Sequence, residues 1–215
     1  MEILNKVDRD DLESLLENTG QNEMSEEMKS FAEALPEIKT IEDLKFLDEK
    51  YYSMFSYEKN AGGMRMNLAS SEIFEKKLYR GCSDIGLSIA PILRYKKVPT
   101  IYVDTARLNW IKNMSANTDG HIFLEVFLDN KWYLYDPTRH LVYDNYNPDN
   151  YSLPNDYYVF AKGLNAWQLG IADSYEQRHY LKERFNDFDI TEYKDPEYDA
   201  YSVKAEQKRK ERWTY

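Results

Sequence analysis

Residues 120–138 read GHIFLEVFLDNKWYLYDPT, and this stretch decides the fold that we expect. Two runs of strand-forming residues, 121–128 and 131–136, stand on either side of Asp129-Asn130. A gap of two residues between such runs is typical of a tight β-hairpin turn. We therefore predict an antiparallel hairpin in which residue 128 faces residue 131.

The register of this hairpin decides which side chains meet. With a two-residue turn, position 123 faces position 136 and position 121 faces position 138. His121 and Asp136 are then diagonal neighbours on one face, about 7–8 Å apart at the backbone. A three-residue loop would place the two side chains on opposite faces. Pro137 favours an extended conformation at Asp136 and ends the ladder.

Cys82 is the single cysteine of the chain and lies at the expected start of a helix. It follows Gly81, and apolar residues then recur at helical spacing. Pro91 predicts a kink or an early end of this helix, because proline removes a helical hydrogen bond. On its own, a lone cysteine is more often a small buried apolar residue. At a helix N-terminus, however, the helix dipole and the free backbone N–H groups favour the thiolate over the thiol.

We predict that this helix packs on one face of the hairpin and brings Cys82 to His121. That face carries His121, Phe123, Glu125, Phe127, Trp132, Leu134 and Asp136. A thiol, a histidine and an aspartate at element boundaries form the set that nucleophilic cysteine catalysis needs. Cys82 would then be the nucleophile, His121 the general base and acid, and Asp136 the residue that orients the histidine. His140 and His179 lack such a context, and we expect them to be structural or surface residues.

Composition places the chain among globular proteins and argues against several partners. It has 215 residues, of which 42% are hydrophobic, and a formal net charge of −10. This charge disfavours binding to nucleic acid and to an anionic membrane. One cysteine excludes an intrachain disulfide and a multi-cysteine zinc site, and we expect no metal and no cofactor. The sequence shows no signal-peptide pattern and no run of transmembrane length, so we expect a reduced, cytoplasmic protein whose oligomeric state is left open.

Changes of pattern divide the chain into three parts. Residues 1–60 read as short acidic helices, residues 61–175 as a catalytic core, and residues 176–215 as a helical extension with a basic tail. In the first part Ser25 is a predicted N-cap, and Thr40 with Asp43 a predicted capping arrangement. The helix after it is predicted to carry Leu44, Leu47, Tyr51 and Met54 at helical spacing. In the core, residues 98–103 read as a strand and residues 105–119 as a loop or irregular helix.

These motifs resemble the transglutaminase-like superfamily, relatives of the papain-like cysteine enzymes. The resemblance covers about residues 65–138 and is specific only in combination. Its parts are Gly81-Cys82-Ser83-Asp84, Leu93-Arg94 before Val98-Pro99, Gly120-His121-Ile122-Phe123-Leu124-Glu125-Val126, and Trp132-Tyr133-Leu134-Tyr135-Asp136-Pro137-Thr138. It implies an α+β fold with a transglutaminase-like or papain-like core. In this core the nucleophilic cysteine begins a helix, and this helix packs on an antiparallel β-sheet that carries the histidine and the aspartate. Further helices precede the core at the N-terminus. The resemblance gives Cys82, His121 and Asp136 the same three roles.

The resemblance also implies acyl transfer through a thioester, with an oxyanion hole for the intermediate. The backbone N–H of Cys82 is the expected first donor. The chain departs from the family at the second donor, because all four tryptophans lie downstream of Cys82 and Lys76 stands where papain-like enzymes place a glutamine. The candidates for this donor are Asn67, Ser70, Ser71 and Tyr79. The chain has no room for the accessory domains and calcium sites of animal transglutaminases, so calcium-dependent cross-linking is not implied.

Three functions remain open at this point. The leading one is a cysteine hydrolase, that is, a peptidase, amidase or deamidase, acting on a peptide, a protein or a small amide. The second is a transamidase or another acyltransferase to an amine, since Arg80-Gly81-Cys82 is similar to the motif of arylamine N-acetyltransferases. The third is an inactive transglutaminase-like binding module. Transfer of the acyl group to water or to an added amine would separate the first two, and the reactivity of Cys82 would test the third.

Overall fold

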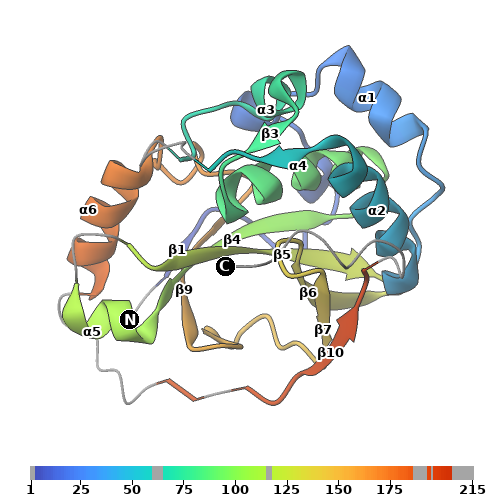
Figure 1. Ribbon diagram of the computed structural model, residues 1–215. Coiled ribbons are helices and arrows are strands. Elements are labelled where there is room, and N and C mark those ends of the chain that lie inside the picture. Colours follow the sequence, from blue (N-terminus) through green and yellow to red (C-terminus); the bar gives the residue numbers. More distant parts are fainter. Residues whose placement is uncertain (1–2, 60–64, 115–117, 186–192, 195, 205–215) are drawn as a thin grey trace.

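A mostly antiparallel β-sheet forms the middle of this mixed α+β fold (Figure 1). The computed structural model describes residues 3–59, 65–114, 118–185, 193–194 and 196–204. In these residues the strand order is β1-β9-β4-β5-β6-β7-β10, with β8 paired to β9. β1 runs parallel to β9, whereas the other neighbours in this sheet are antiparallel. The strands are β1 (Leu4–Asn5), β4 (Thr100–Arg107), β5 (Gly120–Leu128), β6 (Lys131–Asp136), β7 (Leu141–Asp144), β8 (Ser152–Leu153), β9 (Tyr157–Gly163) and β10 (Asp199–Ser202).

Helices α1 to α4 lie over one face of the sheet, and α5 and α6 lie to one side (Figure 1). Their bounds are α1 (Glu26–Glu33), α2 (Leu44–Met54), α3 (Ser70–Lys76), α4 (Cys82–Tyr95), α5 (Leu108–Asn113) and α6 (Ser174–Phe185). A short parallel pair, β2 (Ser56–Tyr57) and β3 (Leu78–Tyr79), joins α2 to the segment before α4. α4 continues through Pro91 to Tyr95, so the helix does not end early. Within the described part of the chain, no helix is both long and apolar enough to cross a membrane.

The β5–β6 hairpin has the predicted register. Asp129 and Asn130 both adopt positive φ, 50° and 59°, as a two-residue turn of this kind requires. Leu128 pairs with Lys131, and the ladder continues to Leu124 opposite Tyr135. The next positions in this register are 123 and 136. The prediction from the turn residues is therefore confirmed, and His121 and Asp136 lie on the same face of the hairpin.

The prediction that α4 packs on the face carrying His121 and Phe123 is wrong. The apolar side chains of α4 form one core cluster with Ile122, Leu124 and Val126, which point to the opposite side of β5. Phe123 belongs to a second cluster beneath the sheet, with partners from the N-terminal segment and from β9. The strands of this sheet are buried on both faces, so alternation of apolar and polar residues does not mark which face takes the helix.

Gly86 allows α4 to lie close against the sheet. A Cβ atom added to this glycine would lie 2.7 Å from Cγ2 of Ile122 and 3.4 Å from Cε2 of Tyr102. Ile122 follows His121 directly, and Gly86 lies in the second turn after Cys82. This close contact therefore fixes the distance between the first turn of α4 and the start of β5.

Both ends of the described chain add strands that the sequence pattern did not indicate, β1 beside β9 and β10 beside β7. The predicted caps are present: Ser25 accepts a hydrogen bond from the backbone N–H of Met28, and the Asp43 carboxylate accepts one from the N–H of Thr40. The helix predicted to carry Leu44, Leu47, Tyr51 and Met54 is α2, in which the first three are buried and Met54 is exposed. The predicted boundary at residues 60–63 and the tail beyond residue 204 lie outside the described residues, and the three-part division stays a prediction.

The predicted strand over residues 98–103 is present but differs in its bounds, since β4 runs from Thr100 to Arg107. The segment 105–119, predicted as a loop or irregular helix, provides the end of β4 and then α5. Arg107 thus lies at the end of a strand beside β9 instead of in a loop, which matters for the site described below.

We predict that Gly86→Ala destabilises the protein by about 1–3 kcal/mol, because the added methyl group meets a β-branched side chain of the sheet. Urea denaturation measures this loss. In an Ile122→Ala background the methyl group has space, and the same substitution should be neutral or should stabilise by up to about 1 kcal/mol through helix propensity. An equal loss in both backgrounds would contradict the proposed contact.

Candidate active site

Cys82 is the first residue of α4 and is partly exposed. A buried ion pair holds the turn before it. Arg80 donates from Nε and Nη2 to the two carboxylate oxygens of Asp84, at 2.7 and 3.0 Å, and its backbone N–H donates to the same carboxylate. Arg80 and Asp84 flank Cys82 in the sequence, so a bidentate pair between them fixes the backbone that carries the thiol.

His121 and Asp136 are in contact. Nε2 of His121 lies 2.9 Å from Oδ2 of Asp136, and both side chains are buried. The carboxylate oxygen lies off the direction of the N–H bond, so attraction between opposite charges contributes more than a straight hydrogen bond. His121 is the second residue of β5 and Asp136 the last residue of β6, so both lie at the end of the hairpin near which α4 begins.

The thiol of Cys82 lies beside the imidazole of His121 and helps to raise the pKa of that imidazole. The structure thus brings together the three residues that sequence reasoning singled out. Burial by itself lowers the pKa of His121, but the negative charge of Asp136 and the neighbouring Cys82 outweigh it and raise the pKa to about 9. A protonated imidazole beside a thiol is the arrangement that stabilises a thiolate.

Arg139 holds Asp136 in place. The backbone N–H of Arg139 donates to Oδ1 of Asp136 at 3.0 Å, which leaves Oδ2 to face the imidazole. The guanidinium of Arg139 lies 3.5 Å from Oδ2 as well. Arg139 follows the Asp-Pro-Thr motif directly, and this turn was not recognised from the sequence.

Tyr157 covers the imidazole of His121. The two rings are stacked with 5.3 Å between centroids and an angle of 29° between their planes. The Tyr157 hydroxyl accepts hydrogen bonds from Arg107 at 2.8 Å and from Arg139 at 3.4 Å. Tyr157 lies on β9, far from His121 in sequence, so no local pattern could have identified it.

Asp104 is a buried carboxylate close to the same histidine. It lies on β4, opposite Ile122 of β5, and both of its oxygens accept from Nε2 of Gln177 at 2.9 Å. Burial raises the pKa of Asp104 to about 7, although the hydrogen bonds from Gln177 and Thr105 and the charge of His121 act in the opposite direction. Gln177 belongs to α6, so the C-terminal helix contacts the edge of the site.

Three of the four side chains proposed as second oxyanion donors, Asn67, Tyr79 and Ser70, take part in other contacts. Asn67 accepts a hydrogen bond from Nη1 of Arg80 at 2.9 Å. Tyr79 is buried and packs edge-on against Tyr52. Ser70 donates to the Leu87 carbonyl and to Asn22. The identity of this donor stays a prediction.

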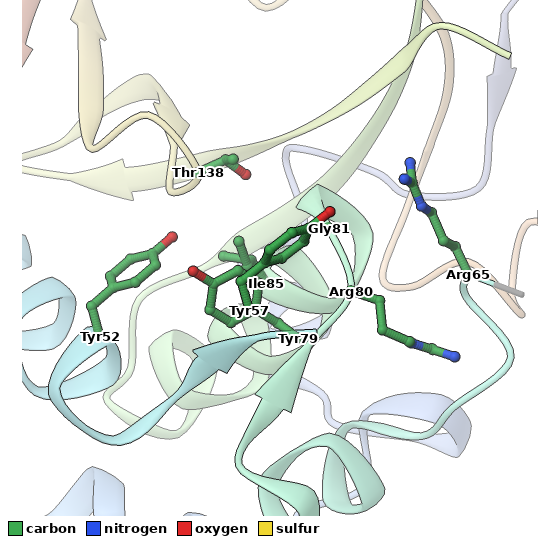
Figure 2. Close-up of a pocket in the computed structure, with 8 residues that line it drawn as sticks. All are labelled: Tyr52, Tyr57, Arg65, Tyr79, Arg80, Gly81, Ile85 and Thr138. Atoms are coloured by element: carbon green, nitrogen blue, oxygen red, sulfur yellow. The ribbon is translucent and has the colours of Figure 1, made fainter. Parts of the chain in front are cut away.

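A pocket of about 160 Å³ is lined in part by Gly81, the residue before Cys82. Figure 2 shows its tyrosines gathered on one side of Gly81, and Arg65 and Arg80 extending on the other side. Thr138, two residues after Asp136, lies across from the tyrosines. The lining residues are Tyr52, Tyr57, Arg65, Tyr79, Arg80, Gly81, Ile85 and Thr138.

Comparison with known proteins gives one result about the fold. No protein-family model and no curated protein matches the chain. Among solved structures, the protein named "Putative Cysteine Protease" from Cytophaga hutchinsonii is similar, with a TM-score of 0.54 and 14% sequence identity. The match covers 77% of this chain and 51% of the other, so the chain spans about half the length of that protein. At this identity the similarity concerns the mixed α+β fold.

We predict that His121 stabilises the protein in a pH-dependent way. Its folded pKa, about 9, lies above the value of about 6.5 expected in the unfolded chain, so its contribution is complete below about pH 6.5 and is lost as the pH rises through 9. The difference in unfolding free energy between wild type and His121→Gln should therefore shrink over this range in urea titrations. His179→Gln, at an exposed position, is the control. A difference that does not change with pH would contradict the ion pair.

We predict an effect of the same sign at lower pH for Asp104, whose pKa is also raised in the folded protein. The Asp104 carboxyl stays protonated up to about pH 7 in the folded protein, whereas in the unfolded chain it loses its proton near pH 3.9. The free energy of unfolding therefore falls by up to about 1.4 kcal/mol per pH unit as the pH rises between these values. Asp104→Asn should flatten the stability profile from pH 4.5 to pH 7. Parallel profiles for the variant and wild type would show that Asp104 keeps its charge.

Proposed function

We propose that this protein is a cysteine-dependent enzyme that transfers an acyl group from an amide through a thioester on Cys82. One observation carries the proposal: the thiol at the start of α4 lies beside an imidazole whose Nε2 is 2.9 Å from a carboxylate oxygen of the buried Asp136. A buried cysteine with a purely structural role needs neither partner. The resemblance of the sequence motifs to the transglutaminase-like superfamily supports the same assignment.

In the proposed first step, the Cys82 thiolate attacks the carbonyl carbon of the amide. The carbon–nitrogen bond breaks, and the His121 imidazolium gives its proton to the departing amine. The backbone N–H of Cys82 is free to face the carbonyl oxygen, because the first N–H groups of a helix have no partner within the helix. The product of this step is a thioester and a neutral imidazole.

In the second step, water attacks the thioester and gives a proton to His121. The carbon–sulfur bond breaks, the acid is released and the thiolate is restored. Asp136 keeps the ring oriented throughout, and Tyr157 covers one face of it. We propose water as the acceptor because the structural neighbour bears the name of a protease.

Substitution of Cys82 tests this proposal most simply. We predict that Cys82→Ala abolishes turnover of every peptide or amide that the wild type converts, and that His121→Ala lowers it by about 10²–10⁴-fold. The measurement is mass spectrometry of a peptide library incubated with each variant, with new termini, deamidation and adducts of added methylamine scored separately. His179→Ala, on the exposed face of α6, is the matched control.

Each outcome of this experiment has a clear meaning. Adducts of methylamine in preference to hydrolysis products would make the protein an acyltransferase. Turnover that persists in Cys82→Ala would overturn the proposal.

Iodoacetamide provides a second readout that needs no substrate, since its reaction with Cys82 at pH 6 should slow in His121→Ala. Equal rates in the two proteins would indicate a thiol that no ion pair activates.

A further inference from the structure

Arg65 presents a charged side chain beside the nucleophile. It is exposed, and its guanidinium lies against Gly81: a Cβ atom added there would be 3.5 Å from Cζ of Arg65. Its backbone N–H donates to Oγ of Ser174 at 3.1 Å, which ties the residue to the start of α6. No acidic side chain among the described residues pairs with it.

The other arginines around the site each have an acidic partner. Arg80 is held by Asp84, Arg107 lies 3.2 Å from Asp119, and Arg139 contacts Asp136. These cations are neutralised by groups of the protein itself. Among the described residues, Arg65 is therefore the arginine beside Gly81 that has no acidic side chain as a partner.

The pocket that Gly81 lines, next to Cys82 in the sequence, holds a second unpaired polar group. Oγ1 of Thr138 is buried there and lacks a hydrogen-bond partner among the described residues. The lining contains no aspartate or glutamate, although the chain as a whole has a net charge of −10. The pocket is thus positively charged although the whole protein is negatively charged. This local positive charge favours the binding of an anionic group.

We propose that Arg65 binds a carboxylate of the substrate next to the amide that Cys82 attacks, so that the protein acts on acidic amides or peptides. This inference rests on the proposed function and adds a substrate class to it. A carboxylate matches the planar fork of a guanidinium, and Thr138 supplies a hydroxyl on the other side of the pocket for a polar group of the same substrate (Figure 2).

A pair of alkylating reagents tests this proposal without knowledge of the substrate. Iodoacetate carries a carboxylate next to the carbon that the thiolate attacks, and iodoacetamide is its neutral counterpart. The measured quantity is the ratio of their rate constants with Cys82. Arg65→Gln should lower the iodoacetate rate by about two- to fivefold, the range for an exposed ion pair, and leave the iodoacetamide rate unchanged. Arg65→Lys should retain most of the preference, and high salt should reduce it in the wild type.

Lys45→Gln is the matched control, because it removes one positive charge from an exposed position on α2. The proposal is overturned if Arg65→Gln leaves the ratio at its wild-type value, or if Lys45→Gln lowers it equally. Either result can occur while Cys82 still depends on His121, so it would leave the proposed function standing. Loss of the proposed function would instead appear with iodoacetamide alone, as equal rates in wild type and His121→Ala.

Discussion

The pairing of Leu128 with Lys131 across the Asp129-Asn130 turn determines which residues of β5 and β6 share a face. In this register His121 and Asp136 lie at the same end of the hairpin and on the same side of it. A shift by one residue would separate them, because side chains alternate between the two faces of a strand. The ion pair, the raised pKa of His121 and the proposed chemistry of Cys82 all depend on this register.

The helix that carries Cys82 reaches the same place from the other face of the sheet. Gly86 brings α4 close to Ile122, and the Arg80–Asp84 pair fixes the turn from which the helix starts. The nucleophile and its histidine are therefore positioned by separate parts of the core and meet at the end of β5. At this end of β5 the thiol of Cys82 is partly exposed, whereas His121 and Asp136 are buried.

Local patterns in the sequence predicted those features that neighbouring residues determine. The turn at Asp129-Asn130, the cap at Ser25 and the helix start at Cys82 are of this kind. Features set by distant parts of the chain were missed or wrong: the face on which α4 packs, and the contacts of Tyr157 and Asp104 near His121. The buried strands are apolar on both faces, so alternation gave no means of choosing between the two faces.

His140 was expected to be a structural or surface residue. It is buried against Asp48, with 2.6 Å between Nδ1 of the imidazole and Oδ1 of the carboxylate.

We propose that His121 is held as an imidazolium between Asp136 and Cys82. Titration of the imidazole nitrogens by NMR measures this directly, with His140 and His179 as internal references. We expect a pKa of about 9 for His121 in the wild type and a lower value in Asp136→Asn. A His121 that titrates near 6.5, the value of an ordinary histidine, in both proteins would contradict it.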